Sequence, residues 1–215
     1  WTLSRGLGDV YKRQNLHQHE AFLQEFDNEQ QKDDCIEWFK TLPLWIEIPG
    51  QLRMIHACWH QPTVDALLQK DVLTQQQQIR AECWAEFALA PKNKADYHIG
   101  DPYIALETLL KGPEMKITDF SYEDTQNKCI RDMLRIKWWE DQPQNMLQAV
   151  ASIDDMEVRE RLQALTFADQ DEETRQWKQR FDYRQQVPVF FGHYWRKGLT
   201  FTEYLACLDL SVAKT

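Results

Sequence analysis

The stretch "LWIEIPGQLRMIH", residues 44–56, contains two short apolar runs on either side of Pro49 and Gly50. Apolar runs of strand length that flank a Pro-Gly pair predict a β-hairpin. The second run ends directly in His56. An imidazole at the end of a buried strand is either a core histidine that bonds a neighbouring carbonyl or a metal ligand on a rigid element.

A second apolar run, "VPVFF" at residues 187–191, ends in Gly192 and His193. It repeats the pattern of a strand followed by a histidine, and Gly192 would allow close approach of the backbone. We therefore expect the rings of His56 and His193 to lie together, at the ends of strands in one sheet. Imidazole suits zinc, iron and, together with carboxylates, manganese, but the spacing alone leaves core histidines and metal ligands both open.

The composition excludes some classes of protein. The 215 residues carry a formal net charge of −9, which disfavours nucleic acid and acidic membrane surfaces as partners. No apolar run approaches the length of about 20 residues that a membrane-spanning helix needs. The five cysteines are widely spaced and form no C-x-x-C pair, which indicates reduced thiols and a cytoplasmic location.

The remaining patterns predict a mixed chain of helices and strands. Helical patterns cover residues 15–26, 33–42, 63–70, 73–89 and 102–111. A strand is expected over 129–139, a helical insertion or cap over 141–186, and a further strand over 205–213. We expect the hairpin 44–57 and the segments 187–192 and 205–213 to form one sheet with an open edge.

The first fourteen residues, "WTLSRGLGDVYKRQ", look like translated adapter sequence and are interpreted as a non-native leader. Their Gly6-Leu7-Gly8-Asp9 run does not have the spacing of a phosphate-binding loop. We expect residues 15–215 to be the C-terminal part of a longer domain.

Five segments carry a resemblance to a known family: "WFKTLPLWIEIPGQLRMIHACWHQP", "ALETLLKGPE", "LRIKWW", "PVFFGHYW" and "ACLDLSVAK". In this order they resemble bacterial calcineurin-like metallophosphoesterases, in the group near the Ser/Thr protein phosphatases and diadenosine-tetraphosphate hydrolases. The resemblance implies an α+β fold with α/β/β/α layers, in which helices flank a β-sandwich. It also implies a site for two divalent ions (Mn, Fe or Zn), with His56 and His193 as metal ligands.

The activity that the resemblance implies is hydrolysis of a phosphate mono- or diester or anhydride by metal-activated hydroxide. The substrate would be a phosphorylated small molecule, a dinucleoside polyphosphate or a phosphoprotein. The family's Asp-x-His, Gly-Asp-x-x-Asp-Arg-Gly and Gly-Asn-His-Glu motifs, which supply the other ligands and the general acid, are missing here. We therefore expect no catalytic residue in this chain, no activity, and at most weak binding of one ion.

Four further residues are candidates for substrate binding: Arg135, Lys111, Trp59 and His60. An arginine fork matches phosphate, whereas a lysine near a helix C-terminus is favoured by the helix dipole in any case. Trp59 and His60 follow the first histidine, and could line a pocket or be a packed aromatic ring and a surface imidazole. The alternative function for the whole chain is a non-catalytic interaction domain whose histidines are structural.

Overall fold

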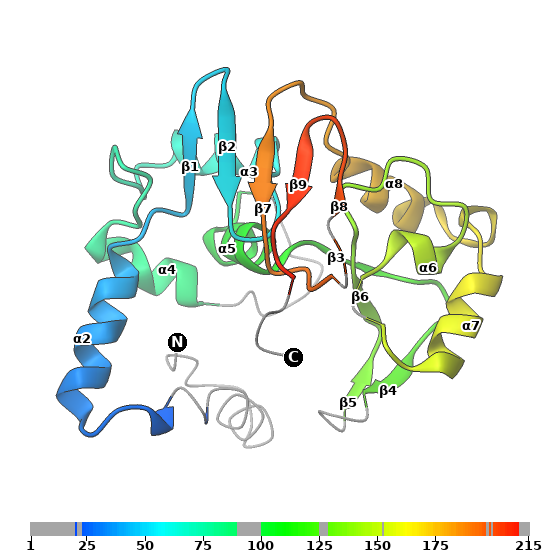
Figure 1. Cartoon of the computed structure of the whole chain (residues 1–215), viewed down its shortest axis with the longest axis horizontal. Coiled ribbons are helices and arrows are strands. Elements are labelled where there is room, and N and C mark those ends of the chain that lie inside the picture. The colour runs from blue at the N-terminus through cyan, green and yellow to red at the C-terminus, as the bar shows by residue number, and fades with distance from the viewer. Residues whose placement is uncertain are drawn as a thin grey trace.

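The computed structural model describes residues 20, 23–89, 100–124, 129–151, 153–196, 198 and 200–210. These residues form a mixed α+β fold, as expected (Figure 1). The leader at 1–14, residues 15–19, 21 and 22 of the helix expected over 15–26, and the end of the strand expected over 205–213 lie outside the described residues.

A five-stranded sheet is the centre of the fold, with the strand order β1-β2-β7-β9-β8. Its strands are β1 (Trp45–Ile48), β2 (Leu52–Ile55), β7 (Val189–Phe191), β8 (Thr200–Phe201) and β9 (Leu205–Cys207). The hairpin β1–β2 turns at Gly50, whose φ of +68° suits a glycine. Strands β2, β7 and β9 run parallel, so their C-terminal ends lie along one edge of the sheet. The expected sheet is confirmed, and the sequence pattern missed only the short edge strand β8.

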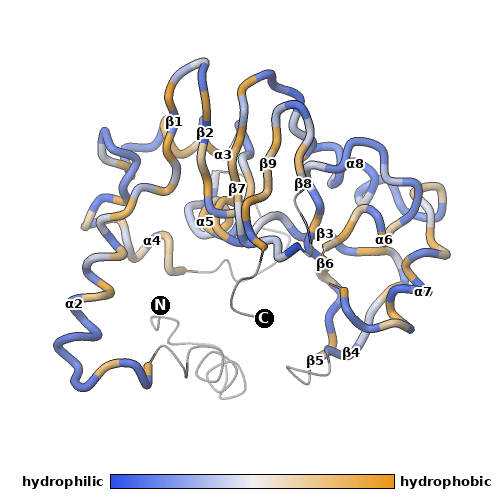
Figure 2. Tube along the Cα trace, in the orientation of Figure 1, coloured by the Kyte–Doolittle hydropathy of each residue, from blue (hydrophilic) through white to orange (hydrophobic). Residues whose placement is uncertain are grey.

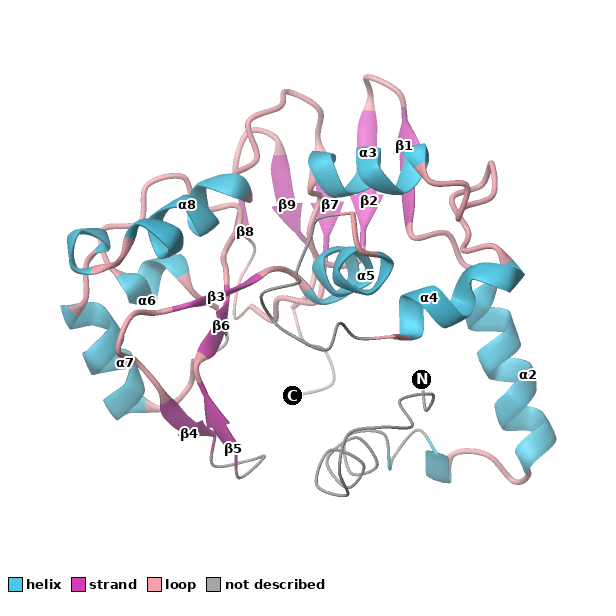
Figure 3. Ribbon diagram, turned by 180° about the vertical axis from the view of Figure 1, so that it is seen from behind, coloured by secondary structure: helices cyan, strands magenta, loops and turns pink. Residues whose placement is uncertain are grey.

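Helices cover one face of this sheet. Helices α3 (Gln61–Gln69) and α5 (Pro102–Lys111) lie behind the sheet in Figure 1 and in front of it in Figure 3, which is the view from behind. The face toward these helices carries buried side chains, including Trp45, Ile55 and Phe191. The opposite face carries exposed apolar side chains on the alternate residues. Figure 2 shows the resulting mixture of hydrophobic residues along the strands.

A second region contains two small antiparallel sheets and three short helices. Strand β3 (Glu114–Lys116) pairs with β6 (Met133–Arg135), and β4 (Tyr122–Asp124) pairs with β5 (Cys129–Arg131). The single strand expected over 129–139 is therefore wrong, because the chain breaks at Asp132 and its two halves join different sheets.

Residues 141–186 are helical in part, as expected. They contain α6 (Met146–Ala149), α7 (Met156–Ala164), a 3₁₀ turn (Phe167–Asp169) and α8 (Glu172–Arg180). They also contribute to the hydrophobic core, since Met146, Val158 and Leu162 are buried in the same cluster as the central sheet.

Capping residues decide where the helices begin and end. Helix α5 has the expected limits, because Asp101 accepts a hydrogen bond from the Ile104 N–H and Gly112 follows the last turn with a φ of +85°. Helix α2 (Glu29–Lys40) begins four residues earlier than the expected Asp33, because Asn28 caps it.

The long helix expected over 73–89 is wrong. Its first part is a turn closed by the bridge between Leu73 and Ile79, in which the Thr74 hydroxyl accepts from the backbone of Gln76 and Gln78. Only a 3₁₀ turn (Ala81–Cys83) and α4 (Trp84–Ala88) are helical. Among the described residues, no helix has both the length and the apolar character needed to cross a bilayer.

Candidate functional site

His56 and His193 lie together at the C-terminal edge of the parallel strands. Each follows a strand end, β2 for His56 and β7 for His193, and these strands are neighbours. The ring centroids are 5.2 Å apart with an interplanar angle of 50°. The Gly192 N–H donates to the carbonyl oxygen of His56 at 2.9 Å. The expectation that these two rings lie together is confirmed.

The loop after β2 is fixed by the core. The backbone N–H groups of Ala57 and Cys58 both donate to the carbonyl of Leu109 near the end of α5, at 3.0 and 3.3 Å. The indole Nε1 of the buried Trp138 donates to the Ala57 carbonyl at 3.0 Å. His56 therefore stands on backbone that three hydrogen bonds hold in place.

His193 has an uncommon backbone conformation. Its φ is +64°, and the Tyr194 N–H donates to the Gly192 carbonyl across it at 2.7 Å. A non-glycine residue in this region is strained, and such strain gathers at functional sites. Gly192 itself is not required by close packing, because a Cβ there would meet its nearest atom, the His56 oxygen, at an ordinary 3.6 Å.

Both imidazoles are neutral at pH 7. Burial lowers the pKa of His56, and the carboxylate of Asp209 partly opposes this effect. Burial, together with the positive charge of Arg135, lowers the pKa of His193 to about 4. Neutral imidazole is the form that binds a metal.

Asp209 is a neighbour of the pair that the sequence reasoning missed. It lies two residues beyond β9, the parallel strand next to β7, and its charge acts on the pKa of both histidines. The signal was present in "LACLD", an apolar strand followed by a potential ligand, which is the pattern that identified the histidines.

Arg135 contacts His193 directly. Its Nη1 lies 3.0 Å from Nε2 of His193, and its Nη2 lies 3.6 Å from Oε1 of Glu114. Lys111 is close enough for its charge to lower the pKa of His193, but its Nζ is paired with Glu107 at 2.7 Å. The structure thus brings Arg135 into contact with His193, whereas Lys111 acts on His193 through its charge.

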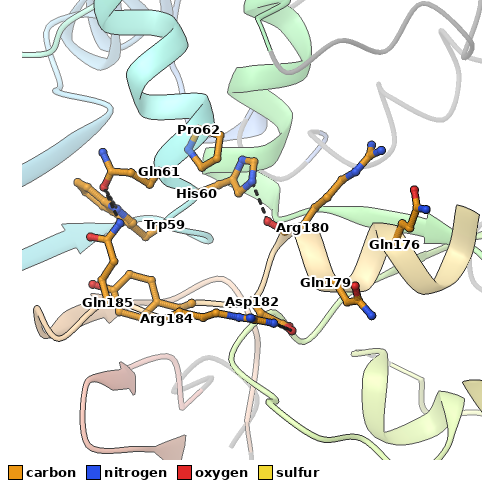
Figure 4. Close-up of a pocket in the computed structure, with 11 residues that line it drawn as sticks. Trp59, His60, Gln61, Pro62, Gln176, Gln179, Arg180, Asp182, Arg184 and Gln185 are labelled. Atoms are coloured by element: carbon orange, nitrogen blue, oxygen red, sulfur yellow. Dashed lines mark hydrogen bonds and ion pairs between the residues drawn. The ribbon is translucent and has the colours of Figure 1, made fainter.

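Trp59 and His60 lie elsewhere. Both side chains are buried and line an open groove of about 640 Å³ between α3 and the end of α8 (Figure 4). None of His56, His193, Arg135 and Lys111 lines this groove. His60 Nε2 donates to the Arg180 carbonyl at 3.0 Å, so its Nδ1 accepts from the Thr63 hydroxyl at 2.7 Å. The sequence left open whether His60 lines a pocket or is a surface imidazole. Its ring is buried, so the surface imidazole is excluded.

The residues present do not form a complete site for two metals. Two neutral imidazoles can be ligands of one divalent ion. Within the described ranges, however, no three side chains of His, Cys, Asp or Glu are placed to hold a metal together. A two-metal site also needs a carboxylate or similar group between the ions.

Comparisons with protein-family models, with curated proteins and with solved structures find no match for this chain.

Proposed function

We propose that this chain is the C-terminal part of a bacterial metal-dependent phosphoesterase that hydrolyses a phosphate mono- or diester or anhydride. The five-stranded sheet would then form one layer of a calcineurin-like β-sandwich. The observation that carries the proposal is the juxtaposition of His56 and His193 at the ends of adjacent parallel strands, with ring centroids 5.2 Å apart.

The surroundings of the pair support a phosphate substrate. Arg135 and Lys111 bring two positive charges to the side of His193, and a guanidinium binds phosphate oxygens through paired N–H donors. The substrate would be a phosphorylated small molecule, a dinucleoside polyphosphate or a phosphoprotein. Trp59 and His60 give this proposal no support, because they line a different groove.

The proposal requires further ligands from outside the described residues. In the intact protein they would be the bridging carboxylate and general acid that the family resemblance implies. This chain by itself is therefore proposed to be inactive. A cytoplasmic location fits the thiols, since Cys35, Cys58, Cys83 and Cys207 are all free in the structure.

The alternative is a non-catalytic interaction domain with structural histidines, and two contacts favour it. His60 uses both ring nitrogens inside the fold. His193 accepts a hydrogen bond from Arg135 at Nε2, the unprotonated nitrogen through which a neutral imidazole would bind a metal.

A hydrolysis assay with p-nitrophenyl phosphate and Mn²⁺ separates the two functions. It compares this chain with a version extended by the upstream part of the gene, each with His193→Ala and with Arg80→Gln as a surface control. We expect turnover only from the extended protein, and expect His193→Ala to abolish it. Turnover by the short chain would contradict the need for upstream ligands, and inactivity of both versions would contradict the phosphoesterase function for aryl phosphates.

A further inference from the structure

Three cationic side chains lie together beside the turn that follows β6. The turn is closed by the Glu140 N–H, which donates to the Lys137 carbonyl at 3.1 Å. The guanidinium of Arg196 lies over the ring of Trp139 in the same turn, with its Cζ 5.7 Å from the ring centroid. The charges of Arg196 and Arg159 both act on the pKa of Lys137. The three cations are therefore close enough to attract one anion together.

Backbone contacts bring Arg159 to this turn and hold Lys137 in place. The Lys137 N–H donates to the Ala149 carbonyl at 2.8 Å, and its Nζ donates to the Leu147 carbonyl at 3.2 Å. Arg159, on α7, donates through Nη1 to the Ile153 carbonyl at 2.8 Å. Both charged ends are thus tied to the segment that precedes α7, and side chains that are already ordered lose less entropy when a ligand binds.

These carbonyl bonds neutralise no charge and use few donors. A guanidinium has five N–H donors and an ammonium has three, so the bonds leave N–H groups on Arg159 and on Lys137 for a ligand. Burial, together with the charges of Arg196 and Arg159, lowers the pKa of Lys137 to about 8, and the carboxylate of Glu140 opposes this. At pH 7 the three side chains are therefore mostly cationic, and they repel one another.

We propose that Lys137, Arg159 and Arg196 form a binding site for a small phosphate-like oxyanion. Such an anion can accept hydrogen bonds from arginine and lysine at the same time, and its negative charge removes the repulsion among the three cations. A small anion fits better than nucleic acid or an acidic membrane surface, because the whole chain carries a formal net charge of −9.

This anion site is separate from the histidine pair. The positive charges that lower the pKa of His193 include those of Arg135 and Lys111, but not those of Lys137 or Arg196. Anion binding at Lys137 therefore needs neither a metal ion nor the proposed phosphoesterase activity.

The first test is isothermal titration of the full chain with pyrophosphate at pH 7 and low ionic strength. We expect one anion to bind, and expect Lys137→Gln, Arg159→Gln and Arg196→Gln each to weaken binding several-fold. Lys137→Arg keeps the charge and should keep most of the affinity. Arg80→Gln is the matched control, because it removes one positive charge from the surface pair of Arg80 with Asp71, and it should bind as the wild type does.

The variants also separate this site from the alternatives. If Arg135→Gln weakens binding and Lys137→Gln does not, the anion lies beside the histidine pair and the proposed site is wrong. A loss in Arg80→Gln equal to that in Lys137→Gln would mean that net charge alone attracts the anion. Absence of binding by the wild type also contradicts the site. Circular dichroism of each variant checks that a loss of affinity is not a loss of the fold.

The second test follows the titration of Lys137 by NMR of its side chain, with and without sulfate. Sulfate stays a dianion over the range in which Lys137 titrates. Because protonation of Lys137 and anion binding should favour each other, sulfate should raise the pKa of Lys137 from about 8 toward its ordinary value of 10.5. Sodium chloride at the same ionic strength is the control. An equal shift in chloride would show only screening of the two arginines, and an unchanged pKa in sulfate would show that no anion binds at Lys137.

Discussion

Both ring nitrogens of the buried His60 have hydrogen-bond partners inside the fold. Burial lowers its pKa to about 4, and the hydrogen bond to the Arg180 carbonyl only partly opposes this. The folded state therefore keeps His60 neutral at a pH where the unfolded chain, with its ordinary pKa near 6.5, is already protonated. The unfolded state binds more protons between these two values, so the folded state loses stability as the pH falls from 6.5 to 4.

His60→Gln should remove this part of the pH dependence. The glutamine amide can donate to the same carbonyl and accept from Thr63, and it does not titrate. The decrease in the free energy of unfolding between pH 7 and pH 4 should be smaller in the variant by on the order of 3 kcal/mol. Urea denaturation at four pH values measures the difference from the wild type. Identical slopes in the two proteins would mean that His60 is solvated.

The left-handed backbone of His193 predicts an order of stability among its variants. A glycine tolerates the φ of +64°, whereas alanine keeps the strain and loses the ring contacts. We expect His193→Gly to be more stable than His193→Ala by about 1 kcal/mol, as measured by chemical denaturation. The opposite order, with alanine the more stable, would indicate an ordinary right-handed conformation at this residue.

At the level of the elements, sequence patterns confined to a few neighbouring residues predicted the helix limits and the hairpin correctly. Helix α5 has its limits because Asp101, Pro102 and Gly112 act locally. The hairpin β1–β2 likewise follows from adjacent apolar runs and Pro49-Gly50. The histidine pair was predictable because both residues follow an apolar strand, and parallel strands bring such ends to one edge.

Features that depend on distant partners were not predictable. The turn at 73–80 is closed by an isolated bridge and by the Thr74 hydroxyl, which override a helical pattern. The break at Asp132 reflects two different partner strands. Arg135 meets His193 through a separate small sheet, so no local signal could give that contact.

The end of α5 gives a prediction with a built-in control. A Cβ on Gly112 would lie 1.8 Å from the hydroxyl oxygen of the buried Tyr194, and its φ is +85°. A Cβ on Gly50, with a φ of +68°, would meet nothing within 4 Å. Gly50→Ala should therefore cost only the backbone strain, about 1 kcal/mol. Gly112→Ala should lower the free energy of unfolding by at least about 3 kcal/mol, because the overlap of the new Cβ with Tyr194 adds to that strain.

Thermal and chemical denaturation of the two glycine variants measure these costs. Tyr194→Phe in the Gly112→Ala background should recover part of the loss, since it removes the overlapping oxygen. If Gly112→Ala and Gly50→Ala have equal stability, Tyr194 does not pack against this turn as described.

For the whole molecule, the feature with the largest consequence is the face of the central sheet that the described residues leave uncovered. Register places Ile46 opposite Met54, Met54 opposite Phe190, and Ala206 opposite both Phe190 and Phe201. The four large side chains of this row are at least one-third exposed. Parallel strands are normally covered on both faces, and an apolar surface of this kind promotes association.

We expect the chain to bind the dye anilinonaphthalene sulfonate and to associate as its concentration rises. Phe190→Lys should reduce both effects, because it places a charge at the centre of the row, where Phe190 is already 36% exposed. Leu68→Lys is the matched control, since Leu68 is 57% exposed on α3, the helix behind the opposite face. Dye fluorescence and sedimentation velocity measure the two effects. This face does not drive association if the wild type stays monomeric and gives no increase in dye fluorescence. The same conclusion follows if Leu68→Lys reduces dye binding and association as much as Phe190→Lys does.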